Sequence, residues 1–342
     1  MMRFLKVLFA IAIVLAIVVG VVYWVRRHPR PEPVPAPPFE TQGKLQIFAL
    51  DVGQGDGLLI VSPGGKTVLI DAGSARVGDE VAAALQRRNI RSLDLAVATH
   101  PHADHIGGLR RVIGKLQVNK LLDSGRDFES EEYDRLKRAV KSRKVEWVTA
   151  KKGWTFDLDS GVRLEAVNPR GNGQWITEVR EGGSVENANS VVLRLSYGNF
   201  AMIFTGDAEF ETEAALIKSK ALLRAQVLKI GHHGSRHATG EAFLKAVNPQ
   251  TAIISCGANN GYGHPSQPTL DRLRKANVQV YRTDLSGEIT IVSDGNSFQA
   301  MPTRQTNLAS LWQGRIGLED EFLAQPQKAA AAKLKLKPEE VD

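Results

Sequence analysis

The chain has 342 residues, 43% of them hydrophobic, which is enough to bury one or two sizeable cores and excludes wholesale disorder. Its single cysteine, Cys256, excludes both an internal disulfide and a structural zinc cluster built on several cysteines. The formal net charge of +7 suggests an anionic partner, but residues 1–44 carry six Lys and Arg against two Asp and Glu. More than half of the excess charge therefore precedes the globular part of the chain, which is only mildly basic.

An uncharged apolar run lies near the start of the chain. Residues 7–25 carry no charge over 19 positions and have basic residues on both sides, so as a helix this run matches the ~30 Å hydrocarbon core of a membrane. A cleaved secretory signal is the alternative, but its apolar region is usually about 7–15 residues long and ends at a small-residue cleavage site, which this sequence lacks. We expect residues 1–28 to be a single-pass anchor that contacts membrane lipid and places the protein in the cell membrane.

Two further segments flank the globular part. Residues 29–38 hold six of the fifteen prolines, so residues 29–44 are expected to form a stiff, extended linker, with an SH3-type ligand as the alternative. Residues 303–342 contain a weak helical stretch at 308–313 and an end rich in Lys, Ala and Glu. We expect them to be a mobile or weakly helical tail.

Residues 45–302 alternate between short β-branched runs and amphipathic stretches. Each half of this region opens with strands and then alternates strands with helices, so two mixed sheets enclosed by helices fit better than one doubly wound sheet. The predicted fold is therefore α/β (α+β). The expected strands are 45–50, 57–62, 67–71, 93–98, 118–122, 162–167, 190–196, 200–205, 226–230, 251–255, 278–281 and 289–292, and the expected helices are 77–88, 130–142, 209–218, 240–247 and 267–276.

Seven of the eight histidines fall into three short stretches that follow predicted strands or loops: THPHADHIGG (99–108), IGHHGSRH (230–237) and YGHPS (262–266). In the first, His100 and His102 alternate so that both imidazoles face one ion, while Asp104 and His105 begin a helix and face a second ion beside it. A carboxylate that could bridge two cations, Asp207, follows another apolar strand in FAMIFTGDAE (200–209). The pattern predicts a metal centre built from histidines and carboxylates.

Six motifs occur in the order and approximate spacing of the metallo-β-lactamase-fold hydrolases. They are DVGQGDGLLI (51–60), VLIDAG (68–73), THPHADHIGG (99–108), NSVVLRLSYGNFAMIFTGD (189–207), LKIGHHGS (228–235) and GYGHPSQPTLDRL (261–273). More narrowly, residues 45–296 resemble the soluble hydrolase domain of ComEC-type DNA-uptake proteins. This resemblance implies an αββα sandwich with a site for two divalent metal ions, Zn²⁺ or Mn²⁺, at the edge of the two sheets.

The resemblance also implies a role for each matching residue. His100 and His102 match the ligands of the first metal, Asp104 and His105 those of the second, and Asp207 the bridging carboxylate. One histidine of the pair matches the last ligand; we favour His233, with His232 facing the substrate. Asp71 matches the aspartate that braces the metal loops.

Further residues are expected near the reacting groups. Asp104, His232 and His264 are the candidate catalytic residues, although a loop-packing role is the alternative for His264. The resemblance places Gln54 and Asp56 at the substrate rim, where a structural turn is the alternative, and Ser235 joins them as a candidate contact.

One departure from the family pattern affects the first metal. Many members have a further histidine ligand before the bridging aspartate, but here no histidine occurs between His105 and His232. The segment ENANSVVL (186–193) places Asn187 or Asn189 in that region, as in the ComEC-type branch. Because Asn is a weak neutral oxygen ligand, we expect a loosely held, water-rich first metal or Mn²⁺ in place of Zn²⁺.

The predicted function is that of a membrane-anchored binuclear metal-dependent hydrolase. Two adjacent cations suit phosphodiester hydrolysis, so the expected substrate is DNA in uptake or processing, with the hydrolase domain exported. The alternatives are hydrolysis of a carbon-based ester, thioester or lactam, and a non-catalytic membrane-tethered DNA-binding module. The chain has no multi-span channel of its own, so a role in uptake requires a separate DNA channel protein. No basic strip interleaved with aromatic residues occurs, so base stacking is not predicted.

Overall fold

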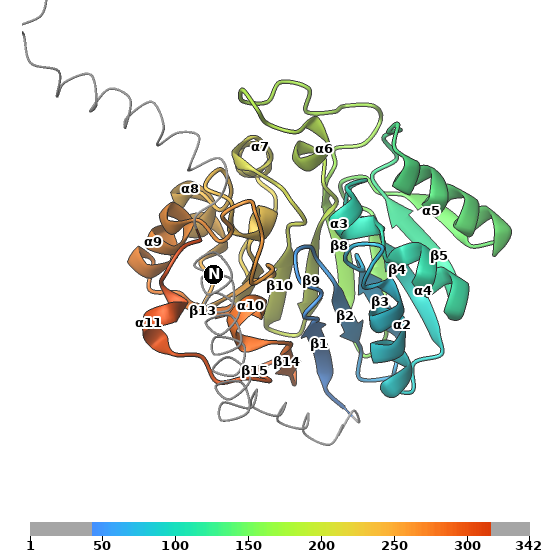
Figure 1. Ribbon diagram of the computed structural model, residues 1–342, viewed down its shortest axis with the longest axis horizontal. Helices are drawn as coiled ribbons and strands as arrows, with labels where there is room; N and C mark the ends of the chain where they lie inside the picture. The colour runs from blue at the N-terminus through green and yellow to red at the C-terminus, as the bar shows by residue number, and fades with distance from the viewer. Residues whose placement is uncertain (1–42, 316–342) are drawn as a thin grey trace, which may run out of the picture. The chain divides into compact units, whose positions relative to one another are not determined.

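A computed structural model describes residues 43–315 of the chain (Figure 1). The predicted anchor at 1–28, almost all of the linker at 29–44 and the tail beyond residue 315 lie outside the described residues. Among residues 43–315, no helix combines the length and the apolar character that a membrane crossing requires.

The first sheet has eight strands in the order β15-β14-β1-β2-β3-β4-β5-β6. Antiparallel pairing from β15 to β3 gives way to parallel pairing from β3 to β6, where helices connect successive strands. The strands are β1 (Leu45–Ala49), β2 (Leu58–Val61), β3 (Thr67–Ile70), β4 (Ser92–Val97), β5 (Gln117–Asp123), β6 (Glu146–Thr149), β14 (Ile289–Ser293) and β15 (Phe298–Pro302).

The second sheet has seven strands in the order β13-β12-β11-β10-β9-β8-β7. The strands from β10 to β13 are parallel, and the others are antiparallel, so this sheet is mixed as well. The strands are β7 (Thr155–Asp157), β8 (Arg163–Asn168), β9 (Val192–Tyr197), β10 (Phe200–Phe204), β11 (Val227–Lys229), β12 (Thr251–Ile254) and β13 (Gln279–Arg282).

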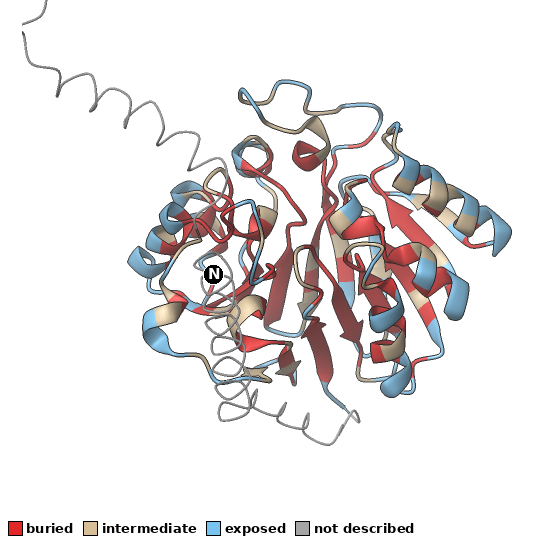
Figure 2. Ribbon diagram, viewed as in Figure 1, coloured by how far each residue is buried: buried red, intermediate tan, exposed pale blue. Residues whose placement is uncertain are grey.

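Helices cover the outer face of each sheet (Figure 1). Those beside the first sheet are α2 (Gly78–Arg87), α3 (Ala103–Ile106), α4 (Leu109–Lys115) and α5 (Glu131–Ser142). Those beside the second are α7 (Phe210–Lys218), α8 (Glu241–Val247), α9 (Gln267–Lys275) and α11 (Leu308–Leu311), and the short helices α6 (Val185–Ala188), η1 (Gly231–Gly234) and α10 (Thr283–Ser286) lie in connections. Figure 2 shows the central strands of both sheets buried and the helices exposed on their outer sides.

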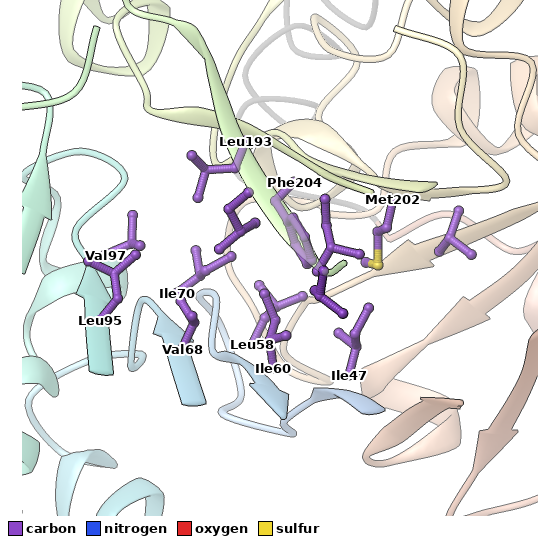
Figure 3. Close-up of a cluster of buried hydrophobic side chains, with 14 of the residues drawn as sticks. Ile47, Leu58, Ile60, Val68, Ile70, Leu95, Val97, Leu193, Met202 and Phe204 are labelled. Carbon is purple, nitrogen blue, oxygen red and sulfur yellow. The ribbon is translucent and has the colours of Figure 1, made fainter. Parts of the chain in front are cut away.

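Three apolar layers hold this arrangement together. The central layer lies between the sheets, where Ile47, Ile60 and Val97 of the first sheet face Met202 and Phe204 of the second (Figure 3). Separate clusters fill the space between each sheet and its helices. Strands buried on both faces explain the continuous apolar runs in the sequence. The predicted two mixed sheets flanked by helices are confirmed.

The packed region extends beyond the expected boundary at residue 302. The predicted weak helix is present as α11, and Leu311 is buried against the second sheet's outer cluster. The Arg282 guanidinium donates hydrogen bonds to the carbonyls of Leu311 and Gln313, at 3.0 and 2.8 Å, and is itself paired with Asp284. Residues 303–315 are therefore docked on the domain, and the prediction of a mobile tail now concerns only residues 316–342, which lie outside the described part.

Candidate metal centre

The predicted ligands come together where strands of both sheets end. His100 follows β4 of the first sheet, Asp207 follows β10 of the second, and His232 and His233 follow the neighbouring strand β11. Because carboxyl ends of parallel strands meet at one edge of a sheet, three separate stretches of sequence contribute to one site.

The loop after β4 is shaped by close backbone approaches. A Cβ on Gly108 would lie 2.0 Å from the carbonyl oxygen of Ala72, so only glycine lets the loop after β4 pack against the loop after β3. Likewise, a Cβ on Gly55, whose φ is +127°, would lie 2.0 Å from the carbonyl oxygen of Asp104. These contacts place Asp104 and His105, at the start of α3, above the DVGQGDG loop.

Two groups of ligand atoms form around Asp207. One group is His100, His102 and Asp207, and the other is Asp104, His105 and His233; within each group all the atoms lie within 4.8 Å of one another. Oδ1 of Asp207 lies 3.2 Å from His105 Nε2 and 3.5 Å from His233 Nε2. Its Oδ2 lies 3.6 Å from His100 Nε2. Asp207 thus presents one oxygen to each group, as a bridging carboxylate must.

Four histidines use Nδ1 for support and leave Nε2 for the cluster. His105 Nδ1 lies 2.8 Å from Asp71 Oδ2, and His232 Nδ1 lies 2.7 Å from Glu209 Oε1. The remaining supports are the Ser255 carbonyl at 2.9 Å from His233 Nδ1 and the Thr99 hydroxyl at 3.1 Å from His100 Nδ1. A carboxylate or carbonyl that accepts the Nδ1 proton fixes the tautomer in which Nε2 binds a metal.

The electrostatics of the cluster favour positive charge. Burial lowers the pKa of His233, but Asp207 and the other nearby carboxylates more than offset it and raise the pKa to about 10. The same balance holds the pKa of His105 well above its ordinary value. Burial raises the pKa of Asp207, yet the surrounding imidazoles hold it well below the usual range. The buried carboxylates thus attract cations, and a divalent ion would take the place of the protons on the imidazoles.

Unpartnered atoms in the cluster fit metal ligation. His100 Nε2 and Asp207 Oδ1 are buried and make no hydrogen bond among the described residues. Burial holds the pKa of His100 well below its ordinary value, which keeps its ring neutral, as ligation requires. Imidazole nitrogens and carboxylate oxygens suit Zn²⁺ and Mn²⁺. The residues present therefore fit a divalent metal centre.

The histidine pair has a strained backbone. His232 and His233 have φ values of 43° and 53°, in the left-handed region that non-glycine residues rarely adopt. This conformation turns both rings toward Asp207: His233 faces Oδ1, while His232 Nε2 lies 3.7 Å from Oδ2 and the side chain remains 24% exposed. His233 belongs to the second ligand group, and His232 lies at the open side.

The expected rim residues fall into different places. Asp56 does not face the opening: it is buried, its Oδ2 lies 2.9 Å from the Lys229 ammonium and its Oδ1 lies 3.4 Å from His233 Nδ1. Gln54 accepts a hydrogen bond from the Gly257 backbone at 3.2 Å, in keeping with the structural alternative. Both residues lie in the loop that passes below Asp104, and of the two only Asp56 is buried.

Asn189 and Ser235 also serve the backbone. The Asn189 amide exchanges hydrogen bonds with the backbone of Ile176, at 2.8 and 2.9 Å, so its oxygen already supports the chain at 176. Ser235 is buried and its carbonyl accepts the Thr269 hydroxyl at 2.7 Å. Asn187, by contrast, has a buried Oδ1 without a hydrogen bond among the described residues. Of the two asparagines considered, Asn187 is the one with a free oxygen.

His264 lies beside the histidine pair. Its ring centroid is 5.1 Å from that of His232, and its Nδ1 is buried without a hydrogen bond within the described range. Burial lowers the pKa of His264 to about 3. The ring is therefore neutral near pH 7 and carries one N–H, which suits a hydrogen bond to an uncharged or anionic substrate oxygen.

Three residues of the site were not predicted from the sequence. Glu209, buried beside the cluster, accepts a hydrogen bond from Arg180 at 3.1 Å as well as contacting His232. Lys229 is fully buried in β11. A lysine inside the apolar run VLKI was the one signal that could have identified it, because a buried lysine requires an anionic partner. Arg180 and Glu209 gave no comparable signal, since charged residues in loops are usually solvated.

The fold and the site define the class of protein. The model of the metallo-beta-lactamase superfamily matches residues 50–258, so the chain belongs to this superfamily, whose members are metal-dependent hydrolases that often bind two divalent metals. This confirms the family predicted from the six motifs.

The curated relatives of the chain are ComEC-type competence proteins. The chain is 31% identical to ComE operon protein 3 of Bacillus subtilis over 271 residues, which cover 74% of this chain and 33% of that protein. It is 30% identical to competence protein ComA of Neisseria gonorrhoeae over 262 residues, 76% of this chain and 33% of that protein. The chain thus matches about a third of the length of these relatives. Among solved structures, it is similar to the metallo-beta-lactamase fold protein YhfI from Bacillus subtilis, with a TM-score of 0.47 and 13% identity over 70% of this chain and 96% of that one.

Proposed function

We propose that this protein is a binuclear metal-dependent phosphodiesterase that cleaves DNA during uptake or processing. The observation that carries the proposal is the position of Asp207, which presents one carboxylate oxygen to each of two histidine-containing ligand groups. Such a centre suits a phosphodiester, because its reaction places negative charge on several oxygens at once. The similarity to competence proteins supports DNA as the substrate.

Each ligand group has a defined place in this proposal. His100, His102 and Asp207 would hold one ion, and Asp104, His105, His233 and Asp207 the other. When bound, two divalent ions supply Lewis-acid stabilisation of the phosphoryl group and a water of lowered pKa. Asp71, Ser255 and Thr99 hold the imidazole rings in orientation, so the ligands need little rearrangement.

The open side of the cluster carries the residues proposed to act on substrate. His232 is oriented by Glu209, and Arg180 holds the Glu209 carboxylate from the other side. His264 offers its remaining N–H to a phosphate oxygen. We assign His232 and Asp104 to proton movement at the reacting phosphate, because their side chains are 24% and 32% exposed and so reach the opening.

The location of the enzyme is part of the proposal. The uncharged run at 7–25 supports a single-pass anchor in membrane lipid, and we propose that the hydrolase domain is exported. We propose that a separate protein supplies the channel for DNA, in keeping with the competence proteins among the relatives of this chain.

The test is a substrate panel with the full-length chain in detergent. Bis-p-nitrophenyl phosphate, single-stranded DNA and the lactam nitrocefin are offered with Mn²⁺ or Zn²⁺, beside Asp207→Asn as the matched variant. We expect metal-dependent cleavage of both phosphodiesters and none by Asp207→Asn. Turnover of nitrocefin without phosphodiester cleavage would instead assign a carbon-centred hydrolase, and tight DNA binding without any turnover would assign a binding module.

A further inference from the structure

An exposed aromatic ring lies beside the metal centre. Tyr262 is 64% exposed, and among residues 43–315 few large apolar side chains are as exposed. Its ring stacks on that of His264, with centroids 6.0 Å apart and planes 23° from parallel. His264 in turn lies 5.1 Å from His232. The open face of Tyr262 therefore adjoins the side of the cluster where a substrate would enter.

The loop that carries Tyr262 is held rigidly by one side chain. Asn260 donates hydrogen bonds to the carbonyls of Gly257 and His264, at 2.7 and 2.6 Å. Its Oδ1 accepts the backbone N–H groups of Tyr262 and His264, at 3.2 and 3.0 Å. Four hydrogen bonds thus order a segment whose aromatic side chain gains little from burial. An ordered ring in solvent lowers the entropy lost when a flat ligand stacks on it.

A second aromatic ring lies at the other end of the cluster. Phe128 is partly exposed in the loop after β5, and its ring centroid lies 6.3 Å from that of His102. A continuous series of ring contacts then leads through His100, His105 and His233 to His264 and Tyr262. The two aromatic rings are therefore the two ends of a series of ring contacts that runs through the metal ligands.

We propose that the substrate is single-stranded nucleic acid, with the bases on either side of the scissile phosphate stacked on Tyr262 and Phe128. This rests on the proposed phosphodiesterase function. Stacking on aromatic side chains is available to every base of a single strand, whereas the bases of a duplex already stack on one another. The sequence did not suggest this, because the two aromatic residues lie in segments far apart along the chain and only the fold brings them to one site.

The test is the binding of a DNA single strand that contains 2-aminopurine, whose fluorescence falls when it stacks. The full-length chain in detergent is titrated in EDTA, so that the strand is not cut. We expect quenching with the wild type and with Tyr262→Phe, and about tenfold weaker binding with reduced quenching for Tyr262→Ala, in which only the Phe128 ring remains. Leu222→Ala is the control, because Leu222 is 59% exposed but lies before β11, away from the site. Phe128→Ala should weaken binding in the same direction.

The outcomes separate this inference from the function on which it rests. If quenching depends on Tyr262 but the phosphodiesterase assay fails, the stacking site is supported and the proposed enzymatic function is not. If phosphodiesters are cleaved but the wild type and Tyr262→Ala quench equally, the enzymatic function is supported and the stacking site is overturned. A strand with abasic sites should bind the wild type at least as weakly as a normal strand binds Tyr262→Ala, because it lacks the bases for both rings. Equal binding of the abasic and normal strands to the wild type would also overturn the stacking site.

Discussion

The ammonium of Lys229 lies 2.9 Å from Oδ2 of Asp56, with both side chains almost fully buried beneath the metal ligands. Burial raises the pKa of Asp56, but Lys229 and His233 more than offset it and hold the pKa below its ordinary value. Lys229 also donates to the Ile230 carbonyl at 2.8 Å. This ion pair links the loop before β2 to β11 and so ties the two sheets together below the site.

We therefore expect substitution of Lys229 to destabilise the fold. Lys229→Met leaves a buried carboxylate without its counter-ion, and we expect a loss of about 3–5 kcal/mol in the free energy of unfolding, measured by urea titration. The double variant Lys229→Met/Asp56→Asn should regain part of it, since no charge is then stranded. Lys275→Met, which breaks the exposed pair with Glu241, is the control and should change little. Equal stability of Lys229→Met and the wild type would contradict the role given to the pair.

Asp71 should control metal affinity through His105. Its carboxylate accepts the Thr99 hydroxyl at 2.6 Å and the Thr99 N–H at 2.9 Å besides contacting His105. Asp71→Asn keeps the left-handed backbone at φ 54°, which Asn tolerates, but it cannot accept all three hydrogen bonds. We expect metal affinity to fall about 10- to 100-fold in competition with a chelator. Asp79→Asn, on the surface of α2, should not change it, and an unchanged affinity in Asp71→Asn would refute the bracing role.

Substitutions of the two adjacent histidines, His232 and His233, should affect the metal content of the protein differently. His233→Asn removes a ligand of the second group and should reduce bound Mn²⁺ from two ions to one per chain. His232→Asn should retain both ions and lose turnover, because His232 lies at the open side. Asparagine is the substitution of choice since both positions have left-handed backbone. Metal analysis of the purified variants decides the matter, and loss of an ion in His232→Asn but not in His233→Asn would reverse the assignment.

Glu213 of α7 should make stability depend on pH. Burial raises its pKa to about 7, although it accepts hydrogen bonds from the backbone N–H groups of Thr239 and Gly240. In the unfolded chain it ionises near pH 4.5. Between these values the folded chain holds a proton that the unfolded chain has lost, so the stability contributed by Glu213 is complete below pH 4.5 and disappears as the pH rises through 7.

The corresponding measurement compares the wild type with Glu213→Gln, which does not titrate. The difference between their free energies of unfolding should fall by about 2–3 kcal/mol from pH 5 to pH 7.5, with EDTA present to exclude metal effects. A difference that is constant across this range would show that Glu213 ionises normally in the folded chain.

Features that are encoded in one contiguous stretch of sequence could be predicted, and features that depend on contacts between distant stretches could not. The buried strands were found because both of their faces are apolar, whereas β6, β7 and β15 are partly exposed and were missed. His100, His102, Asp104 and His105 were found because they occupy one contiguous motif. The pairing of Asp56 with Lys229 and the placement of Phe128 and Tyr262 at one site depend on contacts between distant segments. No periodicity or spacing in the sequence records such contacts.

If the protein is a phosphodiesterase that requires two metal ions, its activity must follow metal binding, and one titration tests this most directly. Metal-free, full-length protein is titrated with Mn²⁺ while bound metal and hydrolysis of bis-p-nitrophenyl phosphate are measured in the same samples. We predict that hydrolysis rises until two ions are bound per chain and that Asp207→Asn reaches neither state. Two bound ions without hydrolysis of this phosphodiester, or of single-stranded DNA under the same conditions, would contradict the account.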